Sequence, residues 1–129
     1  MSNAILIVDD NDDLLLLLRL TLESDGYDVV EAEDGREAIN LSKQMQPKLM
    51  LLDVMMPDLD GLEVTKRIRS NPELAEVPVL LVTADHEITE QQVNQSGADG
   101  IIYKPYDLSA LLNQVQETLF SSSICCCAI

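Results

Sequence analysis

Four apolar runs along the chain end in side chains that can bind a cation or a phosphoryl group. Asp9 and Asp10 follow the first run, Asp53 follows the second, Thr83 ends the third and Lys104 follows a weaker fourth. Three carboxylates held close together would repel one another, and a hard divalent cation such as Mg²⁺, which prefers oxygen ligands and water, relieves that repulsion. A carboxylate nucleophile beside a metal, with a hydroxyl and an ammonium to hold an anion, fits phosphoryl transfer onto a carboxylate.

The segments that must position these residues alternate between strands and helices. Strands are expected at residues 4–8, 28–32, 48–52, 79–82 and 100–103. Helices are expected at residues 12–24, 36–45, 62–70 and 87–96, with a last helix starting near residue 107. The continuous apolar runs indicate strands buried on both faces, so we expect an α/β fold with a doubly wound, five-stranded parallel sheet. In such a sheet the carboxyl ends of the strands share one edge, where ligands bind.

Composition excludes several classes of function. The chain has 129 residues, which suits one domain, and 8 Lys and Arg against 23 Asp and Glu give a net charge of −15. This charge repels phosphate backbones, so we expect no nucleic-acid partner. The sequence shows no signal peptide and no apolar run approaching the ~20 residues of a membrane span. Cysteines occur only at positions 125–127, which excludes a disulfide framework and favours the cytoplasm.

The chain resembles the receiver domains of two-component response regulators over residues 4–120. The resemblance rests on four motifs in order: I-L-I-V-D-D at 5–10, L-L-D-V-M-M-P-D-L-D-G at 51–61, V-T-A at 82–84 and K-P at 104–105. It implies (βα)5 topology with the flavodoxin-like strand order 2-1-3-4-5. We expect the receiver domain to cover residues 1–120, similar to the stand-alone, chemotaxis-regulator-like receivers, and residues 121–129 to form a flexible C-terminal tail.

The resemblance implies a role for each acidic residue of the motifs. Asp53 would accept the phosphoryl group. Asp53 and Asp10 would bind Mg²⁺ directly, the backbone carbonyl of Met55 would be a third protein ligand, and Asp9 would act mainly through water.

The resemblance also assigns the remaining polar positions. Thr83 would hydrogen-bond the phosphoryl oxygen and move when it arrives, and Lys104 would pair with the phosphoryl group. Pro105 would follow a cis peptide bond, which is essentially a proline feature. Gly61 would allow the loop after the third strand to turn.

One position departs from the family pattern. The family usually has Tyr or Phe three residues before the lysine, where this chain has Ile101. Tyr103 lies on the same face of the strand as Ile101 because side chains alternate. Whether Tyr103 takes over the aromatic role in the switch is left open, with partial core packing as the alternative. His86, the single histidine, is expected to be a solvated loop residue.

The first helix carries five consecutive leucines, at positions 14–18. If Leu14, Leu17 and Leu18 face the core, then Leu16 and Leu20 point toward solvent. In the family this helix receives the histidine-containing phosphodonor, which implies a docking surface made of Leu15, Leu16, Leu20 and Pro105. The alternative is scattered surface leucine, which is normal in proteins.

The favoured function is a single-domain response regulator. It would accept a phosphoryl group from a sensor histidine kinase or a histidine phosphotransfer protein and change its affinity for a downstream target protein. It would promote only its own phosphorylation and dephosphorylation, so it is not expected to be a conventional enzyme. A degenerate receiver that binds protein without phosphorylation is the alternative. A phosphohydrolase with an aspartyl nucleophile would need a second acid where Met55 stands, and a flavin carrier would need a phosphate-binding loop in place of D-D-N-D-D.

Overall fold

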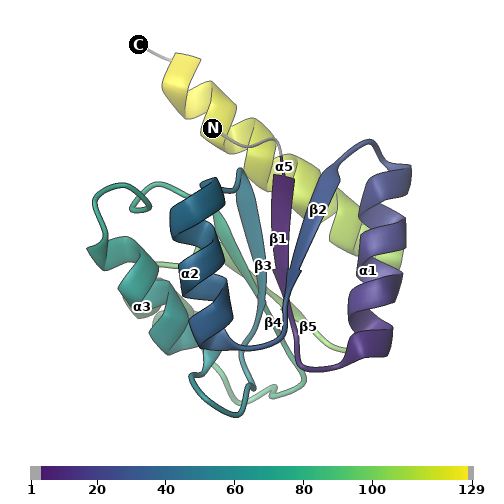
Figure 1. Ribbon diagram of the computed structural model, residues 1–129, viewed down its shortest axis with the longest axis horizontal. Coiled ribbons are helices and arrows are strands. Elements are labelled where there is room, and N and C mark those ends of the chain that lie inside the picture. The colour runs from purple at the N-terminus through teal and green to yellow at the C-terminus, as the bar shows by residue number, and fades with distance from the viewer. Residues whose placement is uncertain (1–3, 128–129) are drawn as a thin grey trace.

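The computed structural model describes the backbone of residues 4–127. Strands and helices alternate in the order β1 (Ala4–Val8), α1 (Asp12–Ser24), β2 (Asp28–Ala32), α2 (Gly35–Met45), β3 (Leu49–Asp53), α3 (Gly61–Ser70), β4 (Val79–Thr83), α4 (Glu90–Ser96), β5 (Gly100–Tyr103) and α5 (Leu108–Cys127). The expected strands and helices are therefore all present. Figure 1 shows the central sheet with its helices around it.

The five strands form one parallel sheet in the order β2-β1-β3-β4-β5. This is the doubly wound, flavodoxin-like arrangement that was expected. The chain changes direction at β1, from which β2 lies on one side and β3 on the other. The ends of β1 and β3 are therefore neighbours, and β4 and β5 follow in sequence beside β3. Ligands bind at this type of switch point in open α/β sheets.

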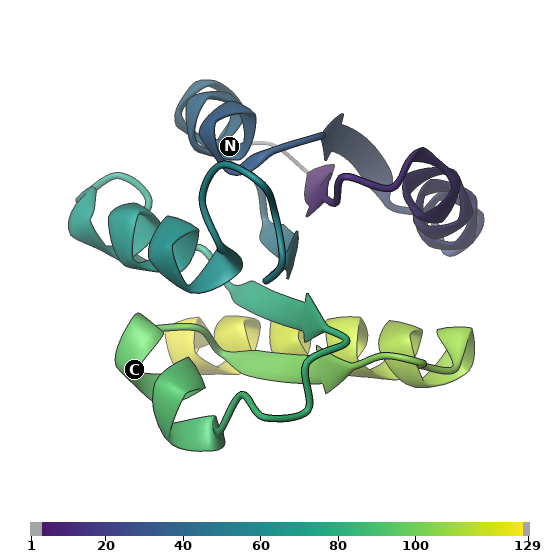
Figure 2. The same ribbon diagram turned by 90° about the horizontal axis from the view of Figure 1, so that it is seen from below.

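The helices cover the sheet in two layers. Helices α1 and α5 pack on one face, and α2, α3 and α4 pack on the other (Figures 1 and 2). The core on the α1 side contains Ile5, Ile7, Leu51, Leu80 and Leu111, and the core on the other side contains Leu6, Met50, Leu52, Ile68 and Val93. Successive strand residues alternate between the two cores, which explains why these strands are apolar throughout.

Helix α1 buries Leu15, Leu18 and Leu22. The expectation that Leu17 faces the core is wrong, since this side chain is 45% exposed. The expectation that Leu15 belongs to a docking surface is also wrong, because this side chain is buried. Five consecutive leucines are compatible with more than one buried face of the helix. Leu22, near the end of the helix, lies on the same face as Leu15 and Leu18, and its burial favours this face.

Side-chain caps fix where the helices begin. The Asn11 side chain accepts a hydrogen bond from the Leu14 amide at 3.1 Å, and Asp60 accepts one from the Glu63 amide at 2.8 Å. Thr89 and Gln92 form a capping box, so α4 begins at Glu90 and not at the expected residue 87. These caps end the connecting loops at defined points and thereby hold the polar strand ends in place.

Helix α5 also differs from expectation, because it continues to Cys127 and residues 121–127 are helical. The expected tail boundary at residue 121 is therefore not a boundary of secondary structure. Its flexibility stays a prediction. None of the helices within residues 4–127 is long and apolar enough to cross a membrane.

Gly61 is required by close packing and not by a turn. A Cβ atom at this position would lie 2.7 Å from the Asp53 carbonyl oxygen and 2.9 Å from the Val54 Cα. The Gly61 amide also donates to the Val54 carbonyl at 2.9 Å. The start of α3 therefore lies directly against the backbone that carries Asp53, and any side chain at position 61 would displace that backbone.

We expect Gly61→Ala to lower the free energy of unfolding by about 1–3 kcal/mol, because rigid backbone must move. Gly100→Ala is the matched control, since its Cβ would meet side-chain atoms of Leu80 and Gln114 at 3.2 and 3.3 Å. Urea unfolding of both variants measures the difference. Equal losses would contradict the role assigned to Gly61.

Candidate functional site

Three carboxylates meet at the carboxyl ends of β1 and β3. Asp9, Asp10 and Asp53 each offer one oxygen, and these oxygens all lie within 4.8 Å of one another. Asp9 and Asp53 are buried, whereas Asp10 is exposed. The expected gathering of these residues is therefore present in the structure. A set of hard oxygen donors at this spacing suits a divalent cation of the Mg²⁺ type, with water completing its ligands.

Lys104 provides the positive charge of the site. Its Nζ lies 3.4 Å from Asp9 Oδ2 and 3.9 Å from Asp53 Oδ2. The Lys104 amide donates to the Thr83 carbonyl at 2.7 Å, which ties the residue to the end of β4. The peptide bond between Lys104 and Pro105 is cis, as expected. One ammonium therefore faces two buried carboxylates and leaves the site with excess negative charge.

Burial, and to a lesser extent the negative charge of Asp9, raises the pKa of Asp53, which is about 6 when all its neighbours act together. Lys104 and the Met55 amide, which donates to Asp53 Oδ1 at 3.3 Å, lower this pKa in part. The carboxylate is thus ionised at neutral pH but remains poorly compensated. Such an oxygen gains from binding a cation, and it is available as a nucleophile.

Met55 has its side chain 59% exposed, while its backbone lies next to Asp53. This fits a role through the backbone alone. That the carbonyl of Met55 binds a metal stays a prediction.

Thr83 is fully buried at the end of β4. Its hydroxyl oxygen accepts a hydrogen bond from the Asp85 amide at 2.9 Å. A hydroxyl both donates and accepts, so its proton is not used by this bond. Thr83 also pairs with Tyr103 across the β4–β5 ladder, whereas Ile101 pairs with Leu81 one layer deeper.

Tyr103 and His86 make contacts that the sequence did not reveal. The Tyr103 hydroxyl donates to the Ile88 carbonyl at 2.7 Å, and the His86 ring stacks on the Tyr103 ring with centroids 5.2 Å apart. His86 Nε2 lies 2.9 Å from the Lys104 carbonyl. His86 is exposed, as expected, but it is not a free loop residue. The loop between β4 and α4 is therefore fastened to β5 through Tyr103.

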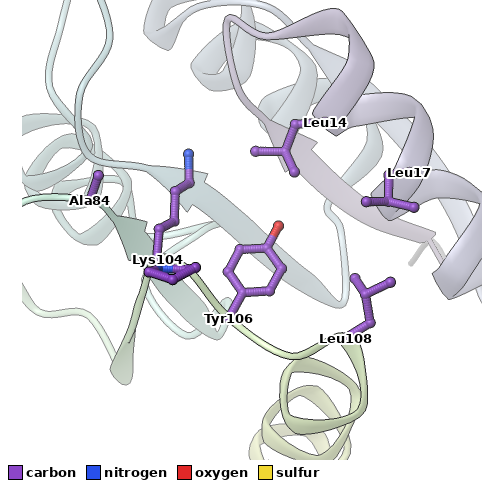
Figure 3. Close-up of a pocket in the computed structure, with 7 residues that line it drawn as sticks. Leu14, Leu17, Ala84, Lys104, Tyr106 and Leu108 are labelled. Carbon is purple, nitrogen blue, oxygen red and sulfur yellow. The ribbon is translucent and has the colours of Figure 1, made fainter.

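An open cavity of about 420 Å³ lies between the start of α1 and the loop after β5. Leu14 and Leu17 line it from α1, and Pro105 and Tyr106 line it from the loop (Figure 3). Sequence reasoning singled out Pro105 at this place but not Tyr106. The only sequence signal for Tyr106 is its position two residues after Lys104.

The exposed leucines of α1 continue this apolar surface. Leu16 and Leu20 are 55% and 56% exposed, as expected, and Leu17 is exposed beside them. Pro105 is exposed as well. The structure therefore places three of the four expected docking residues on the surface, with Leu17 in place of the buried Leu15.

Residues 5–116 match the family described as the response regulator receiver domain. The chain belongs to this family. The acidic cluster and Lys104 of this receiver thus occupy the positions that its motifs predicted.

Two curated relatives of the receiver differ in their length. The polar-differentiation response regulator DivK of Brucella ovis is 32% identical over 120 residues, which are 92% of this chain and 98% of that protein. The DNA-binding dual master transcriptional regulator RpaA of Synechocystis is 40% identical over 116 residues, covering 89% of this chain but 48% of that protein. The receiver spans about half the length of the transcriptional regulators that it matches.

Solved structures confirm the fold. The chemotaxis response regulator CheY4 of Vibrio cholerae superimposes with a TM-score of 0.85 at 29% identity, over 92% of this chain and 99% of that one. A CheY-like receiver domain protein from Methanospirillum hungatei gives a TM-score of 0.86 at 26% identity, over 95% and 98%.

We expect Asp53→Asn to raise the free energy of unfolding at pH 7 in chelator by about 1–3 kcal/mol, because it removes a buried charge. The pKa of Asp53 rises from 3.8 to about 6 on folding, so the gain is full above pH 6. It disappears as the pH falls through 4, where folded and unfolded chains are both protonated. Urea unfolding at several pH values measures it.

Asp28→Asn is the matched control for this measurement. It removes the same charge from an exposed position at the start of β2. A gain of equal size in both variants would show that only the net charge matters and would contradict the explanation from burial.

Proposed function

We propose that this receiver is a phosphorylation-dependent switch in protein interactions, with Asp53 as the phosphoacceptor. The observation that carries the proposal is the arrangement of Asp9, Asp10 and Asp53 within 4.8 Å, with the ammonium of Lys104 3.9 Å from Asp53. The phosphodonor would be a phosphohistidine of a sensor histidine kinase or of a histidine phosphotransfer protein. The phosphoryl group would leave Asp53 only by hydrolysis or by transfer back to a histidine of the partner. The chain would therefore act as a switch and not as a metabolic enzyme.

In the proposed reaction, an oxygen of Asp53 attacks phosphorus and the bond from phosphorus to the donor breaks. Mg²⁺, held by Asp10, Asp53 and the Met55 carbonyl with Asp9 acting through water, would neutralise charge on the phosphoryl oxygens. Lys104 stands close enough to Asp53 to pair with the transferred group. Burial of Asp53 keeps competing water away from the side chain and strengthens each of these electrostatic interactions.

Thr83 would carry the signal away from the phosphoryl group. Its hydroxyl accepts from Asp85, and its free proton can be donated to a phosphoryl oxygen if the side chain moves toward Asp53. That motion would pull on the loop between β4 and α4, which Tyr103 holds through Ile88. Ile101 has no polar tip, so we assign the coupling role to Tyr103. The surface formed by α4, β5 and α5 would then change its affinity for a target.

The phosphodonor would dock on α1. Leu16 and Leu20, with Leu17 and Pro105, form an exposed apolar surface beside the site. Apolar docking suits this chain because its net charge of −15 would repel another acidic protein. Protein partners are favoured over nucleic acid for the same electrostatic reason. We place this exchange in the cytoplasm, where reducing conditions suit the adjacent cysteines of the C-terminal end.

Incubation with acetyl phosphate and Mg²⁺ tests the phosphoacceptor directly. We expect the intact mass to rise by one phosphoryl group, and we expect no rise for Asp53→Asn or in the presence of chelator. If the folded wild-type chain gains nothing under any condition, the phosphoacceptor assignment fails. The alternative of a degenerate receiver that only binds protein would then be favoured.

Tyr103→Phe tests the coupling role. The variant loses the hydrogen bond to the Ile88 carbonyl, worth about 1 kcal/mol, and should still be phosphorylated on Asp53. Hydrogen exchange of residues 84–89 should become faster and should respond less to phosphorylation than in the wild type. An unchanged exchange difference between the two phosphorylation states would contradict coupling through Tyr103.

A further inference from the structure

The hydroxyl of Tyr106 is buried, and it has no hydrogen-bond partner among the described side chains and backbone. A buried hydroxyl without a partner is costly, so it is uncommon unless a ligand or a reaction uses it. The Tyr106 ring lines the cavity between α1 and the loop after β5, together with Leu14, Leu17, Pro105 and Lys104. In Figure 3 the Tyr106 hydroxyl points from the loop toward the side of Leu14 on α1, and the Lys104 side chain extends away from the loop beside it.

The charges around Tyr106 connect it to the acidic site. Burial, together with the negative charges of Asp9 and Asp53, raises the pKa of Tyr106 to about 12. The phenol is therefore neutral at physiological pH and keeps its proton as a hydrogen-bond donor. A donor that feels the charges of Asp9 and Asp53 lies near the acidic site, where a phosphodonor would bring its phosphoryl group.

The transferred phosphoryl group already has its partners. Lys104 and Thr83 stand at the strand ends beside Asp53, whereas Tyr106 belongs to the loop after β5, and its ring lines the cavity. In an in-line transfer the leaving group departs on the side of phosphorus opposite to the nucleophile. Because Asp53 is buried, a donor would reach it from the open side of the site, and its leaving group would depart on that side, where we place the cavity lined by Lys104 and Tyr106.

We propose that the Tyr106 hydroxyl contacts the leaving group of the phosphodonor and favours donors whose leaving group carries a spare hydrogen-bond acceptor. This inference rests on the proposed phosphorylation of Asp53 and assigns a specificity role to a residue outside the family motifs. The apolar side chains of Leu14, Leu17 and Pro105 would contact the carbon atoms of the phosphodonor. The Tyr106 hydroxyl would donate a hydrogen bond to its leaving group.

The chemistry separates two small donors. With acetyl phosphate, the Asp53 oxygen bonds to phosphorus, the bond from phosphorus to the acyl oxygen breaks, and its electron pair leaves on acetate. Acetate has free lone pairs that accept from Tyr106, and no proton is transferred. With phosphoramidate, the protonated nitrogen leaves as ammonia, whose only lone pair is the one that bonded to phosphorus. Tyr106 therefore has nothing to donate to in the second reaction.

Tyr106→Phe tests the inference through the ratio of two rates. Phosphorylation of the variant and of the wild type is followed by intact mass with acetyl phosphate and, separately, with phosphoramidate, both with Mg²⁺. We expect the ratio of kcat/KM for acetyl phosphate to that for phosphoramidate to fall by about tenfold, the effect of one hydrogen bond to a charged acceptor. The melting temperature should stay the same or rise, because the variant removes an unpaired buried hydroxyl.

Tyr27→Phe is the matched control, because Tyr27 precedes β2 at the opposite end of the sheet and contacts Lys48. Its donor ratio should equal that of the wild type. Equal ratios for Tyr106→Phe and the wild type would overturn the inference, as would a lowered melting temperature with both donors slowed alike, which marks a structural role. Failure of both donors on the wild type would instead overturn the phosphoacceptor assignment itself.

Discussion

Repulsion among three carboxylates is the constraint around which this domain is organised. Asp9 and Asp53 are buried beside Asp10, and Lys104 is the cation that the described part of the chain places among them. No single element could hold such a group, because its members come from β1, β3 and the end of β5. The apolar packing of the strands supplies the free energy that keeps these like charges together. Because the negative charge of this site exceeds the positive charge of Lys104, the site favours the binding of a cation.

The close contact at Gly61 shows how the same constraint acts on the backbone. The start of α3 lies against the peptide that carries Asp53, so the loop between them has little freedom to relax. Asp58, in that loop, accepts hydrogen bonds from the Gly35 and Arg36 amides at 3.0 Å, which joins it to the start of α2. Burial opposes the ionised form of Asp58, but these hydrogen bonds outweigh it and lower its pKa. The loop that follows Asp53 is thus held by the start of α2 and by the start of α3.

The sequence was sufficient for the parallel sheet and the meeting of Asp53 with Lys104, because continuous apolar runs and polar strand ends are local signals. The strand order followed from the resemblance of the motifs to the receiver family. It was not sufficient where several solutions compete. Five leucines in a row do not define a helical face, so Leu15 and Leu17 were exchanged. The start of α4 is fixed by the capping box of Thr89 and Gln92. The sequence alone did not exclude a longer helix that begins at residue 87.

Contacts between loops were the least visible in the sequence. The hydrogen bond from Tyr103 to Ile88 joins residues 15 positions apart, and no periodicity encodes it. Tyr106 was missed because its unpaired hydroxyl becomes informative only when the surrounding cavity is known. Such features arise from tertiary packing, which sequence patterns describe poorly.

The two helical layers have a consequence for how partners assemble. The surface that we assign to the phosphodonor belongs to α1, whereas α4 packs on the other face of the sheet (Figure 2). The proposed output surface of α4, β5 and α5 therefore reaches both faces of the sheet, because α5 packs on the α1 side and α4 packs on the other. A target that contacted α4 alone would leave α1 free for a donor, whereas a target that contacted α5 would lie on the same face as the donor. Only the α4 part of that surface can therefore diverge in sequence without altering the face that the donor contacts.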